Sequence, residues 1–242
     1  RRKARPGSAC WLKRPINLVM AERMPQSAFP DYWDKALNFL SDRDPVMKAL
    51  IARYRHVPFR AHPSVLDSIL RAIVGQQVSN TAAATVWTRL TEQKQGRWES
   101  FILISSTQSL IDLGLNTRKV AAMKEVAWRW VTGRWSEEKF RAMRDEEAIT
   151  EIVSVKGLGP WSAMSVLIFA LQRPDVFPET DFGIRTALIK NYLPDENIKT
   201  IIRSEAQSRV KLIADVWAPY RTVAAWFLWR SLENTPFEKE SE

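Results

Sequence analysis

Hydrophobic residues recur at intervals of three and four along most of this chain, which is the spacing of one face of an α-helix. Leu66, Ile69 and Ile73 belong to one such stripe, and similar stripes run through 161–171 and 220–228. Strand-like alternation of hydrophobic and polar residues between hairpin turns is absent from the sequence. The pattern therefore predicts an all-α protein.

Residues that cap or break helices separate these stretches. Proline and glycine gather at 157–160 and 174–178, where regular helix should stop. Several hydrophobic stretches follow a side chain that can accept the first backbone N–H groups of a helix. These predicted helix starts are Ser79, Thr107, Ser136 and Asp181.

The charge balance narrows the choice of partners. The 242 residues carry a net charge of +9, which favours nucleic acid as a partner, although simple solubility would give the same balance. A basic arm, 1–30, lacks the apolar core of a signal peptide. Cys10 is the only cysteine, which excludes intrachain disulfides and cysteine-ligated zinc or iron–sulfur sites. The apolar runs are too short to span a bilayer, so no membrane partner is expected.

The most informative segment is 155–163, Val-Lys-Gly-Leu-Gly-Pro-Trp-Ser-Ala. Gly157 and Gly159 bracket one apolar residue just before a helical pattern, so they predict a tight hairpin at a helix N-terminus. Unpaired N–H groups and the helix dipole make such a turn favourable for a phosphate. An ordinary connection between two helices is the alternative, because two glycines alone are weak evidence.

This segment resembles the helix-hairpin-helix motif of DNA-repair proteins, and its spacing to Asp181 resembles the helix-hairpin-helix–GPD glycosylases. Within that superfamily the chain is most similar to the 3-methyladenine DNA glycosylase II family. The likeness extends to 73–79, 114–120 and 217–224, and spans roughly residues 60 to 232. It implies a two-lobed helical fold with the active-site cleft between the lobes. The expected lobes are 61–174, with the hairpin, and 31–60 together with 175–242.

The resemblance places Asp181 at the catalytic position. Breaking an N-glycosidic bond builds positive charge on the sugar, and a nearby carboxylate stabilises that charge. An alkylated purine already carries positive charge, so a single carboxylate can suffice. A helix N-cap is the alternative role of Asp181, and the two roles are compatible.

Two tryptophans are expected in the base pocket. By resemblance Trp161 and Trp229 stack on the extruded base. Both also belong to apolar helix faces, so a place in the core is the alternative for each. Ser165 stands where the characterised family member has a further pocket aromatic, which leaves base selectivity open. Bifunctional members of the superfamily have a Schiff-base lysine at the position of Trp161, so the resemblance implies a monofunctional enzyme.

The remaining contacts implied by the resemblance are to DNA and to one ion. Gln76 and Gln77 occupy the turn that fills the hole left by the extruded base, with Gln77 at the wedge position, although loop glutamines are commonly just solvated. A monovalent cation, sodium or potassium, is expected on the backbone carbonyls of Val153, Val155 and Leu158. The expected phosphate contacts are Lys156, Gly157, Gly159, Ser162, Arg118 and Lys119.

These expectations predict a monomeric enzyme that removes 3-methyladenine- or 7-methylguanine-type bases from duplex DNA and leaves an abasic site. It would act in the cytoplasm, near the nucleoid, of a bacterium or in the nucleus of a eukaryote. One alternative is a related glycosylase for hypoxanthine, etheno or uracil lesions. Another is a helix-hairpin-helix module that binds DNA without catalysis, against which the retained Asp181 argues.

Overall fold

The computed structural model describes residues 29–193 and 204–232, and for 204–207 it describes the helix backbone alone. Within these ranges every regular element is a helix, so the prediction of an all-α fold is confirmed. None of these helices combines the length and the apolar character that a membrane span requires. Nearly all of the predicted basic arm, residues 1–30, lies outside the described ranges.

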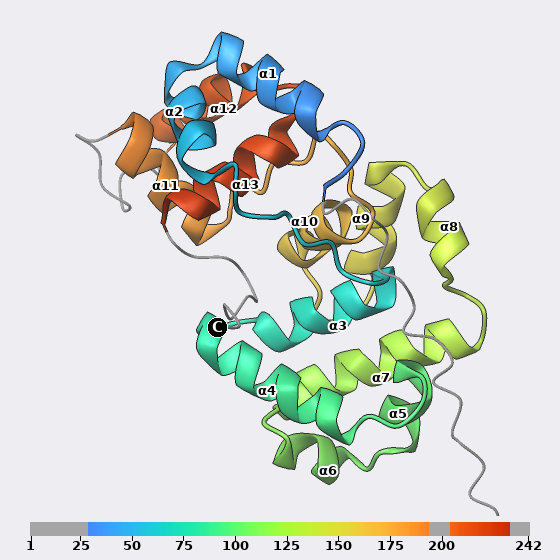
Figure 1. Cartoon of the computed structure of the whole chain (residues 1–242). Coiled ribbons are helices and arrows are strands. Elements are labelled where there is room, and N and C mark those ends of the chain that lie inside the picture. Colours follow the sequence, from blue (N-terminus) through green and yellow to red (C-terminus); the bar gives the residue numbers. More distant parts are fainter. Residues whose placement is uncertain (1–28, 194–203, 233–242) are drawn as a thin grey trace, which may run out of the picture.

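One group of helices lies at the upper left of Figure 1. Its centre is α13, which packs against α1, α2 and α11. The group consists of α1 (Trp33–Arg43), α2 (Pro45–Tyr54), α11 (Phe182–Tyr192), α12 (Ser204–Asp215) and α13 (Arg221–Ser231). Its members come from both ends of the described chain.

A second group is built from the continuous middle of the chain. Its centre is α3, which packs against α4, α7, α8 and α10, while α5 and α6 pack on α7 and α9 packs on α10. The first five members are α3 (Val65–Gly75), α4 (Asn80–Gln93), α5 (Trp98–Ile104), α6 (Thr107–Asp112) and α7 (Thr117–Val131). The last three are α8 (Glu137–Ala142), α9 (Asp145–Val153) and α10 (Pro160–Phe169). The lobe limits near residues 60 and 175 stay a prediction.

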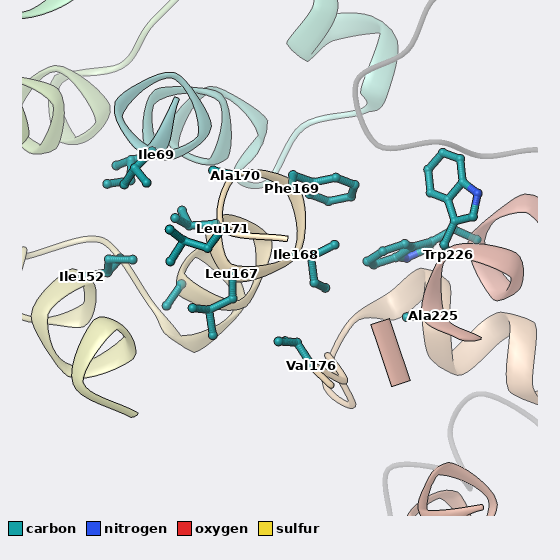
Figure 2. Close-up of a cluster of buried hydrophobic side chains, with 14 of the residues drawn as sticks. Ile69, Ile152, Leu167, Ile168, Phe169, Ala170, Leu171, Val176, Ala225 and Trp226 are labelled. Atoms are coloured by element: carbon teal, nitrogen blue, oxygen red, sulfur yellow. The ribbon is translucent and has the colours of Figure 1, made fainter. Parts of the chain in front are cut away.

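Helix α10 joins the two groups. Figure 2 shows its side chains directed toward Ile69 of α3, Ile152 of α9 and Trp226 of α13. Phe169, at its last position, stacks on Phe59 with ring centroids 5.8 Å apart. A helix enclosed on all sides needs apolar side chains all round, which explains why α10 shows no polar face. Full burial of a phenylalanine such as Phe59 contributes about 2–3 kcal/mol.

Most of the predicted helix starts are confirmed. Ser79, Ser136 and Asp181 are the N-caps of α4, α8 and α11, and each side chain accepts a backbone N–H of the first turn. The prediction at Thr107 is wrong by one residue, because the Ser106 side chain caps α6 and Thr107 is the first helical residue. Two adjacent hydroxyl side chains offer the same cap, and the turn geometry selects between them.

Candidate active site

The loop that leads to Asp181 is fixed by the N-terminus of α13. Arg221 forms a bidentate pair with Asp175, with its Nε and Nη2 atoms 2.7 and 2.8 Å from the two carboxylate oxygens. The Arg221 guanidinium holds the pKa of Asp175 below its ordinary value, against the opposing effect of burial. Val176 donates its N–H to the Thr222 hydroxyl at 3.0 Å. These two contacts anchor the loop to α13.

Asp181 is the N-cap of α11. Its Oδ1 atom accepts the Ile184 N–H at 2.8 Å, which satisfies one of the unpaired donors of the first turn. Its own N–H donates to the Pro178 carbonyl at 2.9 Å, so backbone and side chain are both fixed. The capping role left open by the sequence is thus present, and it holds the carboxylate at a helix N-terminus.

Two indoles from different helices also bind this carboxylate. Trp161, at the start of α10, donates its Nε1–H to Asp181 Oδ2 at 2.7 Å. Trp229, near the end of α13, donates its Nε1–H to Asp181 Oδ1 at 2.9 Å. Side chains separated by 20 and 48 residues in the sequence therefore converge on one aspartate.

A cavity of about 560 Å³ opens beside these three side chains. This volume lies within the range of pockets that hold a small organic ligand. Among the residues that line it, Asp181 alone has an ionisable side chain. The lining residues are Gly75, Gln76, Gln77, Val78, Asn80, Gly157, Trp161, Asp181, Phe182, Gly183 and Trp229.

The turn between α3 and α4 forms one wall of the cavity. Gln77 is exposed and has a φ of 57°, a left-handed conformation that few non-glycine residues adopt. The Gln76 side chain is directed toward the hairpin. Its Nε2 atom donates to the Gly157 carbonyl at 2.8 Å and lies 3.3 Å from the Ser162 hydroxyl. The two glutamines thus have different settings: Gln76 joins the turn to the hairpin, and Gln77 faces solvent.

The predicted hairpin connects α9 to α10. Gly157 has a φ of +98°, where a side chain would be strained. Gly159 is the N-cap of α10 and supplies no capping side chain, while Pro160 has no N–H to satisfy. The first-turn N–H groups of α10 therefore have no side-chain cap, and Lys156 in the preceding hairpin is exposed. These features suit a phosphate.

Lys119 departs from the sequence-based expectation of a phosphate contact. Its side chain is buried, and its Nζ atom donates to the Val74 carbonyl at the end of α3, at 2.8 Å. Burial lowers the pKa of Lys119 from its ordinary value. A lysine at a helix C-terminus satisfies carbonyls that have no intrahelical partner, which explains this position. Its neighbour Arg118 is exposed, as a phosphate contact would need.

Other predicted site residues are more buried than expected. The Ser162 side chain is 3% exposed, so it meets Gln76 rather than solvent. Ser165 does not line the main cavity; it lies behind the two indoles, where it borders a hollow of about 10 Å³. Trp229 is only 4% exposed and stacks on Phe169 with centroids 5.9 Å apart, whereas Trp161 is half-buried.

Five lining residues were missed in the sequence, namely Gly75, Val78, Asn80, Phe182 and Gly183, and the last two directly follow Asp181. Phe182 is 72% exposed at the mouth of the cavity, directly after Asp181. It is out of phase with the buried face of α11, formed by Ile184, Ala187 and Leu188, and that mismatch was the available signal. Gly183 permits the indole to approach, because a Cβ there would lie 3.1 Å from Trp229 Cδ1 and from Asp181 Oδ1.

The expected cation ligands lie at the end of α9 and in the hairpin. The Val155 carbonyl accepts the Leu158 N–H at 3.0 Å, which leaves one lone pair for another partner. Backbone carbonyls at a helix C-terminus carry partial negative charge and suit a hard monovalent cation. Within the described ranges, no three His, Cys, Asp or Glu side chains cluster as metal ligands.

Known proteins are similar to this chain in sequence and in fold. DNA-3-methyladenine glycosylase 1 of Schizosaccharomyces pombe is 26% identical over 195 residues, covering 78% of this chain and 82% of that protein. DNA-3-methyladenine glycosylase of Saccharomyces cerevisiae is 24% identical over 254 residues, covering 90% and 85%. The S. pombe 3-methyladenine DNA glycosylase in complex with abasic DNA superposes with a TM-score of 0.72 at 27% identity, covering 85% of this chain and all of that one. No family model matches the sequence.

A helix-hairpin-helix beside a cavity with one fixed carboxylate defines the class of helix-hairpin-helix DNA glycosylases. In sequence and in fold this chain is similar to 3-methyladenine DNA glycosylases, which are helix-hairpin-helix–GPD proteins. The resemblance found in the sequence is thereby confirmed.

Proposed function

We propose that this protein is a DNA glycosylase that hydrolyses the N-glycosidic bond of alkylated purines in duplex DNA. The observation that carries the proposal is the setting of Asp181, whose carboxylate is fixed by three N–H donors at the wall of a cavity large enough for a base. A protein that only binds phosphates would gain nothing from a fixed negative charge facing DNA. Release of methylated bases from alkylated duplex DNA by the purified protein is the experiment that tests it.

The chemistry needs little beyond this carboxylate. As the bond between the sugar C1′ and the base nitrogen breaks, its electron pair leaves with the base, and positive charge develops on the sugar. Asp181 stabilises that charge at short range. Water then forms the new bond to C1′ and loses its proton to Asp181 or to solvent. The products are the free base and an abasic sugar.

The lining of the cavity favours a base that is already charged. A neutral leaving base such as hypoxanthine needs a proton from a general acid, which is usually a His, Lys, Tyr or carboxylic acid side chain. Among the lining residues only Asp181 has an ionisable side chain, and it is assigned to charge stabilisation. A base alkylated at a ring nitrogen departs without that proton. Alkylated purines are therefore the substrate class, and neutral lesions are the second candidate.

The proposal assigns DNA binding to the hairpin and to the turn opposite it. Phosphates meet the uncapped N-terminus of α10, with Lys156 and Arg118 as exposed cations nearby. Gln77 enters the minor groove and fills the space left by the extruded base. The protein acts as a monomer on duplex DNA, with a sodium or potassium ion on the hairpin carbonyls.

Replacing Lys156 by alanine should reduce the salt dependence of DNA binding. Each neutralised phosphate contributes about −0.9 to the slope of log K against log salt on duplex DNA, so the slope should become shallower by about that amount. Lesion preference should not change. Lys35 is exposed on α1, in the other group of helices, so Lys35→Ala is the matched control. Titrations of fluorescent duplex at several salt concentrations measure both slopes, and equal slopes would contradict the phosphate contact.

Borohydride should fail to trap the protein covalently on alkylated DNA. The side chain beside Asp181 at the start of α10 is Trp161, which has no amine to attack the sugar carbon. Strand scission should therefore require added alkali or a separate lyase. Gel analysis of borohydride-treated reactions detects any adduct. An adduct that disappears in Lys156→Ala would overturn the monofunctional assignment and place the amine in the hairpin.

A further inference from the structure

The contacts of Asp181 suggest a second role for the two tryptophans. A stacking residue acts through its ring face, yet here both indoles turn their N–H edges to the same carboxylate, one to each oxygen. With the Ile184 N–H, Oδ1 accepts two hydrogen bonds and Oδ2 accepts one. A carboxylate oxygen accepts about two hydrogen bonds, so Oδ2 retains the free lone pair.

The Trp229 side chain is fixed by its packing, so its ring cannot reorient to stack on a base. Its ring stacks on Phe169, Phe169 stacks on Phe59, and Phe59 packs against Trp33 with centroids 5.2 Å apart. This aromatic column runs from α10 through the α2–α3 connection to α1. On the other side, the absence of a side chain at Gly183 lets the indole reach Asp181. With 4% of its surface exposed, Trp229 offers little ring face to a ligand.

Trp161 reaches the carboxylate from the other group of helices. Its helix α10 begins at the hairpin, whereas Asp181 and Trp229 lie on α11 and α13. The hydrogen bond from Trp161 to Oδ2 therefore links the helix that follows the hairpin, the proposed DNA-binding element, directly to the carboxylate. Because α10 packs against α3 and α9, the helix that carries this donor is held in place.

We infer that Trp161 and Trp229 are positioning residues that clamp the Asp181 carboxylate by their indole N–H groups. The clamp fixes the carboxylate plane and directs the free lone pair of Oδ2 into the cavity, where the sugar charge develops. A fixed, preorganised carboxylate stabilises developing charge better than one that must reorient. This inference rests on the proposed base-release activity.

Phenylalanine substitutions distinguish the role of the indole N–H group from that of the aromatic ring face. Trp229→Phe and Trp161→Phe keep an aromatic ring and remove the N–H donor. Each should lower kcat for release of 7-methylguanine about tenfold, the factor for losing about 1.4 kcal/mol, which is typical of a hydrogen bond to a charged group. KM should change less than about twofold, since a phenylalanine ring keeps an aromatic wall at each position and the rest of the cavity lining is unchanged. Stacking alone predicts the reverse: kcat near wild type, with any effect in KM.

Trp226 provides a matched control on the same helix. It is 1% exposed, and its Nε1 atom has no hydrogen-bond partner among the described residues. Trp226→Phe should therefore leave kcat within about twofold of wild type, because it removes a donor that binds nothing. Equal losses in Trp226→Phe and Trp229→Phe would show that ring packing, rather than the N–H group, matters, and would overturn the inference.

A spectroscopic measurement tests the clamp without any activity. In ¹⁵N-labelled protein, the phenylalanine variants identify the indole N–H signals of Trp161 and Trp229. In Asp181→Ala both signals should move upfield, while the Trp226 signal stays in place. Unmoved signals would overturn the clamp even if the enzyme releases methylated bases. If the signals move in Asp181→Ala but the wild-type protein releases no base, the clamp is retained and the proposed function is rejected.

Discussion

Replacing Asp181 by asparagine is expected to lower base release at least about 100-fold, which corresponds to about 2.7 kcal/mol of transition-state stabilisation. The substitution removes the negative charge and preserves the shape. It also leaves one indole without an acceptor, because an asparagine has a single side-chain oxygen for donors on both sides of the carboxylate. The helix cap can persist through that oxygen.

Single-turnover release of methylated base measures this loss. Binding to an abasic duplex and the thermal midpoint of the same variant are the controls, and both should stay close to wild type. Near-wild-type release by Asp181→Asn would reject Asp181 as the catalytic carboxylate. Loss of folding together with activity would instead assign the residue to the cap alone.

Replacing Asp44 by alanine is expected to lower the free energy of unfolding by about 3 kcal/mol. Asp44 is 7% exposed between α1 and α2, where Oδ1 accepts the Met47 N–H at 2.9 Å. Its Oδ2 atom accepts the Tyr192 hydroxyl and the Trp217 indole, each at 2.7 Å. Alanine removes a helix cap and leaves one buried donor, on Trp217, and one half-buried donor, on Tyr192, unpaired. Burial raises the pKa of Tyr192, as does the adjacent carboxylate, so its hydroxyl stays a donor.

Urea unfolding at neutral pH measures this effect. Asp42, two residues away and exposed on α1, is the matched control, and Asp42→Ala should change stability by less than about 0.5 kcal/mol. Similar midpoints for Asp44→Ala and wild type would show that the buried contacts of Asp44 contribute no net stability.

The helices and their caps follow from local patterns. The stripe through Leu66, Ile69 and Ile73 predicts α3 because a one-sided core leaves a helical period in the sequence. The roles of side chains are harder to predict in helices that are enclosed on all sides. Helix α13 is buried from Thr222 to Ser231, so its sequence does not distinguish core residues from pocket residues. The position of Trp229 in the pocket therefore came from the family resemblance, and its near-complete burial from the structure.

Contacts between residues far apart in the chain could not be predicted from the sequence. Nothing in the local pattern around Lys119 shows that α7 begins against the end of α3, where the Val74 carbonyl takes its ammonium group. For the same reason an exposed basic residue and a buried one look alike there. The two indole bonds to Asp181 depend on where α10 and α13 meet α11, so the sequence could predict the three residues but not their hydrogen bonds.

The most direct test of the account is chromatography of the bases released from methylated duplex DNA by the full-length protein. The account predicts free 3-methyladenine and 7-methylguanine, one abasic site for each base released, and intact strands until alkali is added. Release by Asp181→Asn should be at least about 100-fold slower. Tight binding of the same DNA with no free base and no abasic sites would contradict it, and would make this protein a binding module.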